Sequence, residues 1–240
     1  MVRENTEGFY PDRNLHKGYG EFWPNEDTVL SLRVITRSAC ERIARTAFEL
    51  ARSRAKKNLV TAVHKSNVLI EGDGLFLEEV GKMSKRFTDV RLDDGLVDSV
   101  GMQLVLNPEK FDVLVTTNLF GDILSDISAA EVGGLGLAPS LNSGDRYAMA
   151  QSVHGAAPDI AGRGIANPVA EILSTSMLLG WMASKQNDPS LKKTALTIET
   201  AVGAILYNED PGSLTVDLGG HASTKEFTTN VLNVIEHLGA

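Results

Sequence analysis

An apolar stretch typical of a strand runs directly into a stretch typical of a helix, and this junction constrains the fold most strongly. The apolar stretch is Phe111 to Thr116, and 118–126 follows it with the sequence Asn-Leu-Phe-Gly-Asp-Ile-Leu-Ser-Asp. Asp122 and Asp126 are four residues apart, so they project from one face near the start of the helix. Like charges at this spacing repel, and a hard cation bound between them would offset the repulsion. A helix-start aspartate followed by a solvated one explains the pair equally well.

Helices and strands alternate along the rest of the chain, which favours an α/β fold. Ser38 and Glu41 form a capping-box pattern that opens a helix through about Lys56. A Gly-rich stretch at 133–136 is followed by loops. The other predicted elements are strands at 59–63 and 111–116, helices near 75–87, 98–106 and from 118, and three longer helices near 168–184, 191–207 and from 223.

The segment from Pro11 to Asp27 differs from its surroundings, because it is rich in Gly, aromatic and charged residues and resembles no helix. Its aromatics include Tyr19, Phe22 and Trp23. An arm or hairpin that covers these side chains against another subunit explains the composition, and a surface loop explains it equally well.

Length, charge and cysteine usage exclude several classes of protein. The 240 residues suggest one large or two modest domains. A net charge of -8 argues against a nucleic-acid partner, and it allows a small anionic substrate only where cations are concentrated locally. Cys40 is the single cysteine, so no intrachain disulfide is possible. No apolar run approaches bilayer length and Met1 to Asn5 is no signal peptide, so we expect a cytoplasmic protein without a membrane partner.

Some residues carry little information until they are combined. Arg3, Tyr10, Lys65 and Asp98 are each explained by surface charge or a helix cap, although Lys65 follows an apolar strand at the end where α/β sites gather. The stretch 154–168 contains many small residues, which is typical of backbone folded closely around a flat ligand and leading into a helix. No GxGxxG is present, so the ordinary Rossmann phosphate loop is absent.

Taken together, five segments resemble the β-decarboxylating dehydrogenases, the family of isocitrate, homoisocitrate, 3-isopropylmalate and tartrate dehydrogenases. The resemblance covers nearly the whole chain, in order, and the form Arg-Glu-Asn-Thr-Glu-Gly is more similar to the isocitrate and homoisocitrate branches. The segments are 2–10, 63–68, 97–103, 118–126 and 154–168.

The resemblance implies an isocitrate/isopropylmalate dehydrogenase-like two-domain α/β fold that lacks the family's amino-terminal part. Residues 1–132 would form a smaller dimerisation domain with a clasp-like arm and the metal and substrate residues. Residues 133–240 would form the carboxyl-terminal part of the large cofactor-binding domain. The active sites of such a homodimer are shared between its two subunits.

The resemblance also implies a role for each matched residue. Arg3 grips the malate-like carboxylates, and Tyr10 and Lys65 are the catalytic proton-transfer residues, with Lys65 reaching the site from the partner subunit. Mg²⁺ or Mn²⁺ is held by Asp122 and Asp126, joined by Asp98 of the partner subunit. The implied NAD-binding residues are Asn67, His154, Gly155, Ala157, Pro158, Asp159, Ile160 and Asn167.

Asp159 indicates which dinucleotide is used, because an acidic side chain accepts bonds from the ribose 2′-hydroxyl and repels a 2′-phosphate. Asp159 and Ile160 stand where NADP-dependent relatives carry a Lys-Tyr pair. Val216 and Gly220 match positions where some of those relatives carry Tyr and Arg. The sequence therefore favours NAD.

Three functions follow from these observations. The first is NAD-dependent oxidative decarboxylation of a 3-substituted malate of the isocitrate, homoisocitrate or 3-isopropylmalate class. The second is a catalytically silent, truncated or regulatory subunit-like protein that dimerises. The third, a metal-dependent lyase or hydrolase that uses the aspartate pair, leaves the loop at 154–168 unexplained.

Overall fold

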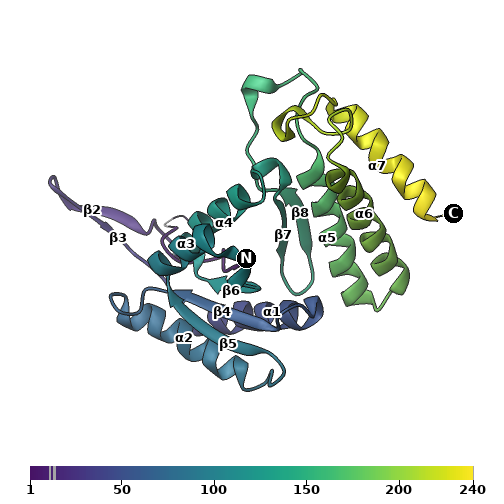
Figure 1. The fold of residues 1–240 in the computed structure, drawn as a ribbon. Helices are drawn as coiled ribbons and strands as arrows, with labels where there is room; N and C mark the ends of the chain where they lie inside the picture. The colour runs from purple at the N-terminus through teal and green to yellow at the C-terminus, as the bar shows by residue number, and fades with distance from the viewer. Residues whose placement is uncertain (11, 13–14, 240) are drawn as a thin grey trace. The chain divides into compact units, whose positions relative to one another are not determined.

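A computed structural model of the chain describes residues 1–10, 12 and 15–239, which form two compact units, Met1–Glu131 and Val132–Ala240 (Figure 1). The first unit contains a four-stranded sheet in which all neighbouring strands are parallel. The strands, in spatial order, are β1 (Val2–Arg3), β6 (Val113–Thr116), β4 (Leu59–His64) and β5 (Arg91–Leu96).

Helices cover both faces of this sheet. Successive residues of a strand point to opposite faces, so each strand divides its side chains between two cores. In β4, Val60 and Ala62 pack with α1 and α2, whereas Val63 packs with α3 and α4 on the other face. These layers confirm the predicted α/β class. The helices of the first unit are α1 (Arg37–Arg54), α2 (Ile70–Ser84), α3 (Val97–Leu106), η1 (Pro108–Lys110) and α4 (Asn118–Glu131).

Two helix starts differ from prediction. The cap of α1 is Thr36, whose hydroxyl accepts the Ala39 N–H at 3.3 Å, so Ser38 lies inside the first turn instead of capping it. Helix α2 begins at Ile70, five residues before the predicted start at Leu75. The glycines in its first two turns lower its intrinsic helix propensity, so the sequence pattern does not indicate that the helix begins at Ile70.

Besides the two-residue β1, three strands were not predicted. Strand β5 has the sequence Arg-Leu-Asp-Asp-Gly-Leu and lies at one edge of the sheet, where its first four residues are exposed. A strand with this exposure needs no apolar alternation, so the pattern gives no signal. The loops predicted after 133–136 contain an antiparallel pair, β7 (Pro139–Ser143) and β8 (Ala148–Ser152), built mainly from small and polar residues.

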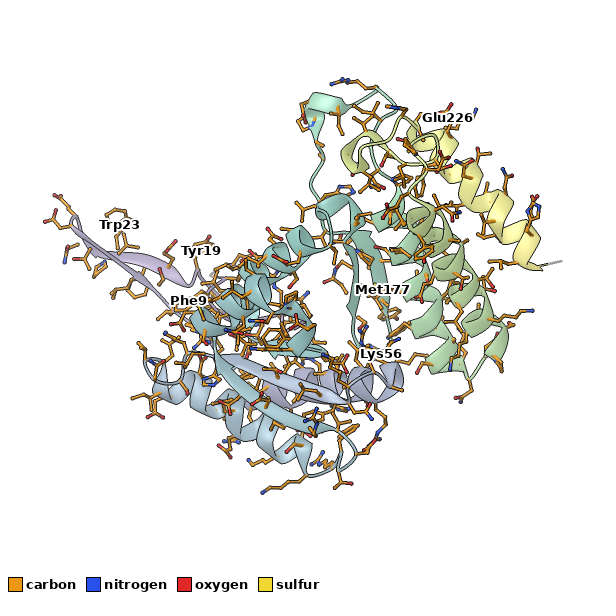
Figure 2. All side chains as sticks on the ribbon, in the orientation of Figure 1. Phe9, Tyr19, Trp23, Lys56, Met177 and Glu226 are labelled. Carbon is orange, nitrogen blue, oxygen red and sulfur yellow. The ribbon has the colours of Figure 1, made fainter. Side chains whose placement is uncertain are left out.

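An antiparallel hairpin follows the first strand and consists of β2 (Glu21–Asn25) and β3 (Thr28–Ser31). Of the segment predicted as an arm, Pro11, Arg13 and Asn14 lie outside the described residues. Tyr19 and Trp23 are exposed, and Figure 2 shows both side chains along this projecting element. The hairpin alternative is therefore observed, and its contact with another subunit stays a prediction.

The second unit packs three long helices around one apolar core, and the β7–β8 pair lies against α5. Buried Val169, Val202 and Phe227 bring α5, α6 and α7 together. No helix in the described part of the chain is long and apolar enough to cross a membrane. The elements of this unit, besides the two strands, are η2 (Leu135–Leu137), η3 (Pro158–Ile160), α5 (Val169–Gln186), α6 (Pro189–Asn208), η4 (Val216–Leu218) and α7 (Thr224–Gly239).

Candidate active site

The carboxyl ends of the four parallel strands carry most of the residues that the sequence singles out in the first unit. Arg3 ends β1, and Lys65 directly follows β4. Asp98 lies at the start of α3 after β5, and Asn118 and Asp122 begin α4 after β6. Open parallel sheets bind ligands outside this edge, so the topology gathers these side chains where a site is expected.

Arg3 is the centre of one cluster. Its Nε donates to Asn118 Oδ1 at 2.8 Å, one terminal nitrogen donates to Asp122 Oδ1 at 2.5 Å, and the other donates to the Tyr10 hydroxyl at 3.0 Å. The amide of Asn118 is itself fixed, because its Nδ2 donates to the Glu7 carbonyl at 2.8 Å. The guanidinium of Arg3 is therefore held in one orientation, with its two terminal nitrogens directed at Asp122 and Tyr10.

Gly121 makes this orientation possible, because Arg3 crosses the first turn of α4 in direct contact with it. A Cβ at position 121 would lie 2.6 Å from Arg3 Cγ, much closer than carbon atoms pack. Any larger residue at this position would displace the side chain of Arg3.

Two glutamates for which the sequence predicts no role hold the segment between Arg3 and Tyr10. Glu4 is 5% exposed and accepts the Thr6 N–H at 2.8 Å and an Arg42 N–H at 3.0 Å. Glu7 is 8% exposed and accepts the backbone N–H and the hydroxyl of Thr36, both at 2.7 Å. Both glutamates belong to the Arg-Glu-Asn-Thr-Glu-Gly motif, and this motif is the sequence feature that could have indicated their role.

Lys65 and Asp98 form a second cluster on the same edge. Lys65 Nζ lies 2.9 Å from Asp98 Oδ1, and this hydrogen bond holds the pKa of the Asp98 carboxyl below its ordinary value. Asn67 is exposed in the turn that follows Lys65. Asp126 is exposed one helical turn after Asp122 and forms no hydrogen bond or ion pair with any residue that the structure describes.

The predicted metal ligands do not all meet within one copy of the chain. Among the described residues, no three His, Cys, Asp or Glu side chains come together as a metal site. Asp122 and Asp126 supply two carboxylates from adjacent turns of α4, whereas Asp98 pairs with Lys65. A third carboxylate ligand would therefore come from a second copy, and this stays a prediction.

The environment of Tyr10 keeps its hydroxyl protonated. Burial raises the pKa of Tyr10 above its ordinary value; the positive charge of Arg3 opposes this shift, and the negative charge of Asp122 adds to it. The hydroxyl therefore holds its proton at neutral pH and can donate it to a reacting group nearby.

In the second unit, the loop predicted to wrap a cofactor is exposed and is shaped by local bonds. His154 Nδ1 donates to the Gly155 carbonyl at 2.9 Å. Ala157 has a φ of 43°, and the short helix η3 that follows it carries Asp159 and Ile160. The carboxylate of Asp159 is exposed and has no partner among the described residues, so it is available to accept a ribose hydroxyl.

Asn167 has a different environment from the rest of this loop. Its Nδ2 donates to Asp217 Oδ2 at 2.9 Å, and its Oδ1 accepts the Val169 N–H at 2.9 Å at the start of α5. Both ends of the amide are therefore engaged within the chain. The predicted contribution of Asn167 to cofactor binding would need one of these bonds to be exchanged.

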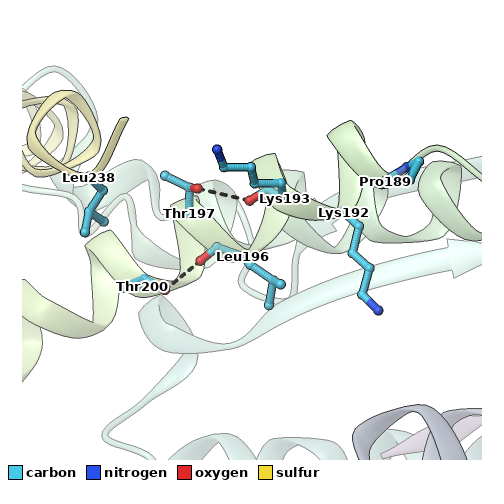
Figure 3. A pocket seen from close by; sticks show the side chains of 7 residues that line it. All are labelled: Pro189, Lys192, Lys193, Leu196, Thr197, Thr200 and Leu238. Carbon is cyan, nitrogen blue, oxygen red and sulfur yellow. Dashed lines mark hydrogen bonds between the residues drawn. The ribbon is translucent and has the colours of Figure 1, made fainter. Parts of the chain in front are cut away.

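A separate hollow of about 380 Å³ lies along α6 and includes the end of α7, and none of the sequence-predicted site residues lines it (Figure 3). The hydroxyls of Thr197 and Thr200 donate to carbonyls of their own helix, so they are not directed into this hollow as donors. Its lining residues are Pro189, Lys192, Lys193, Leu196, Thr197, Thr200 and Leu238.

Comparison with known proteins gives matches over almost the whole chain. The sequence profile of the isocitrate/isopropylmalate dehydrogenase family matches residues 1–231. An isocitrate/homoisocitrate dehydrogenase of Thermus thermophilus is 47% identical over 99% of the chain and 66% of its own length. A homoisocitrate dehydrogenase of Methanocaldococcus jannaschii is 46% identical over 98% of the chain and 62% of its own length.

A solved structure agrees with these matches. The crystal structure of isocitrate dehydrogenase from Methylococcus capsulatus superposes with a TM-score of 0.82 and 41% identity, over 97% of the chain and 66% of that protein. The chain thus spans slightly less than two thirds of the length of the curated relatives that it matches.

Proposed function

The chain belongs to the isocitrate/isopropylmalate dehydrogenase family, and from this premise we propose that it takes part in NAD-dependent oxidative decarboxylation. The proposed substrate is a 3-substituted malate of the isocitrate, homoisocitrate or 3-isopropylmalate class. The observation that carries the proposal is the cluster of Arg3, Tyr10 and Asp122 at the carboxyl edge of the sheet, because it joins an anion-binding fork to a proton donor and a carboxylate.

Arg3 would bind a substrate carboxylate. Its planar guanidinium presents two terminal nitrogens, a geometry that matches a carboxylate and that a lysine does not provide. Asn118 fixes the guanidinium through Nε and leaves these two nitrogens for exchangeable partners. The bound anion would then replace contacts that Arg3 now makes with Asp122 and Tyr10.

The carboxylates of Asp122 and Asp126 fit Mg²⁺ or Mn²⁺, since both are hard cations that prefer oxygen ligands and both side chains are accessible. Asp98 of the partner subunit would complete the set. When bound, the ion supplies Lewis-acid polarisation of the substrate oxygens. Asp122 would exchange its contact with Arg3 for one with the cation, which frees Arg3 for the substrate.

Tyr10 and Lys65 would carry out the proton transfers of the reaction. The protonated hydroxyl of Tyr10 is suited to return a proton to carbon after carbon dioxide leaves. Lys65 of the partner subunit would help to remove the substrate hydroxyl proton while NAD, when bound, accepts the hydride. Because Lys65 and Asp98 are paired on one chain, a second copy would receive both groups together.

A stripe on α3 supports a second copy of this chain as the partner. Asp98, Met102 and Val105 follow one another at helical spacing, and the two apolar side chains are 53% and 58% exposed. Ile123 on the adjoining helix α4 is 52% exposed. An apolar face next to an exposed site residue supports an interface that is built around the site.

The metal assignment is tested by Mn²⁺ titration with thermal denaturation. Mn²⁺ should raise the melting temperature, because it binds only the folded state. Asp122→Asn should abolish most of the rise, whereas Asp145→Asn, at an exposed aspartate in the turn between β7 and β8, should preserve it. Equal responses from both variants would overturn the assignment.

The shared site is tested by mixing two variants that are each inactive. Tyr10→Phe and Lys65→Ala remove groups proposed to meet in one site from different subunits. After co-refolding, half of the dimers should be mixed and each should hold one intact site, which restores about a quarter of wild-type turnover with NAD and a panel of 3-substituted malates. Failure to restore activity refutes sharing. A wild-type chain that responds to Mn²⁺ but never turns over favours the silent, regulatory alternative.

A further inference from the structure

A buried ion pair that has no role in the proposed chemistry lies behind the candidate site. Asp73 in α2 is fully buried and accepts an Arg33 N–H at 2.5 Å, and the side chain of Arg33 is 10% exposed. Removing two charges from water carries a large desolvation cost, so a buried pair is weak evidence for a stabilising role. The position of the pair therefore indicates its role better than its contribution to stability does.

Asp73 holds the segment that carries Lys65. Its second carboxylate oxygen accepts the backbone N–H of Lys65 at 2.5 Å. This bond fixes the chain at the point where it leaves β4, and the direction of the Lys65 side chain depends on it. Asn67 lies two residues further along the same turn.

Arg33 contacts the segments that carry the other cluster. The nitrogen that donates to Asp73 also donates to the Thr117 hydroxyl at 3.2 Å, immediately before α4. The guanidinium lies over the ring of Phe9 at 5.5 Å and over the ring of Phe120 at 5.7 Å. Phe9 precedes Tyr10 in the chain, and Phe120 lies two residues before Asp122.

We propose that Arg33 and Asp73 are positioning residues that fix the Lys65 turn relative to Tyr10 and Asp122. The inference rests on the proposed function, in which Lys65 serves the site of the partner subunit and Tyr10 serves its own. In a symmetric dimer, the distance and direction from the Lys65 turn to Tyr10 and Asp122 on one chain determine how both active sites assemble. The buried pair fixes this arrangement, because it is bonded to the Lys65 turn and to Thr117 next to α4.

Two glycines of α2 provide a matched perturbation. A Cβ at Gly72 would lie 3.0 Å from Arg33 Nη1 and 3.4 Å from Ile35 Cγ1, so Gly72→Ala pushes the guanidinium without removing any charge. A Cβ at Gly74 would meet nothing within 4 Å. Both changes raise helix propensity equally, so their difference isolates the displacement of Arg33.

The test follows the amide of Lys65 by NMR in the wild-type chain and in Gly72→Ala, Gly74→Ala and Asp73→Asn. In Asp73→Asn the amide should lose the downfield shift of a bond to a carboxylate and exchange with solvent about tenfold faster. In Gly72→Ala the carboxylate stays and Arg33 moves slightly, so the amide should shift in the same direction by a smaller amount. In Gly74→Ala it should stay at its wild-type position. A wild-type amide in Gly72→Ala overturns the proposal even if Asp73→Asn fails to fold.

Turnover and Mn²⁺ binding separate this inference from the proposed function. Where the wild-type chain is active, Asp73→Asn should lower kcat about tenfold and Gly72→Ala should lower it by a smaller factor, each with a smaller change in KM, while the Mn²⁺-induced rise in melting temperature is retained. A shifted Lys65 amide with unchanged kcat overturns the positioning role. An inactive wild-type chain contradicts the proposed function alone, because the amide measurement still decides whether the pair fixes the turn.

Discussion

Gly121→Ala should displace Arg3, the residue proposed to bind the substrate, without replacing any proposed site residue. The new Cβ would lie 2.6 Å from Cγ, 2.8 Å from Cβ and 3.0 Å from Cδ of Arg3. Carbon atoms pack best at about 3.5–4.0 Å, so the two segments must separate by about 1 Å. The crowded atoms belong to the root of the side chain, which β1 fixes in the sheet through its pairing with β6, so rotating the far end of Arg3 gives no relief.

The magnitude follows from two opposing effects. An alanine in place of a helical glycine gains about 1 kcal/mol of helix propensity, whereas overpacking costs about 1–3 kcal/mol. The melting temperature should therefore fall slightly. Binding should fall much more, because a shift of 1 Å breaks charge-assisted hydrogen bonds worth about 1.5–3 kcal/mol each, which corresponds to roughly a tenfold to hundredfold weaker affinity.

Calorimetric titration and thermal denaturation measure these two effects. The ligand is whichever 3-substituted malate binds the wild-type chain most tightly in the presence of Mn²⁺. Gly81→Ala in α2 is the matched control, since its Cβ would meet nothing within 4 Å and the substitution should raise the melting temperature without changing affinity. If Gly121→Ala behaves like this control in both measurements, the argument that Gly121 places Arg3 is refuted.

Three further predictions concern other groups. Burial raises the pKa of the Cys40 thiol to about 12, so a disulfide reagent at pH 8 should modify it at least about 100-fold more slowly in the native chain than after denaturation. The Lys65 ammonium lowers the pKa of Asp98 below its unfolded value of about 3.9. The pair therefore stabilises the fold above that pH, and the stabilisation is lost as the pH falls through the lowered pKa. Lys65→Met should raise the pKa of Asp98 in a carboxyl NMR titration and remove this acid dependence of stability. Replacing Asp159 by Lys and Ile160 by Tyr should move the cofactor preference toward NADP by at least about tenfold in kcat/KM. An unchanged preference would mean that the loop at 154–167 does not line the adenosine site.

The fold was predictable where a local pattern coincides with a buried position. The apolar residues of β4 and β6 are buried on both faces of the sheet, so their sequences indicate central strands without ambiguity. Strand β5 is specified by pairing with β4 and carries little apolar signal of its own. Thr36 competes with Ser38 as the cap of α1, and the choice is settled by Glu7, 29 residues away in sequence.

The candidate site was predictable in its residue types and only partly in its arrangement. The sequence places Lys65 and Asp122 after predicted strands, and the parallel sheet gathers the ends of those strands. The bonds that orient them join residues far apart in sequence, such as Arg33 and Asp73, which are separated by 40 positions. A single sequence does not indicate which distant residues are paired, so the bonds that orient the site residues are seen only in the folded chain.

The β5 edge of the parallel sheet limits how copies of this chain can associate. Strand β5 carries two adjacent aspartates, and both residues are exposed. Charges on an edge strand repel the same edge of another molecule. Growth of the sheet from copy to copy through β5 is therefore disfavoured in crowded or partly unfolded samples. We expect encounters between copies to be diverted from open-ended β-aggregation toward contacts made by helices and by the projecting hairpin.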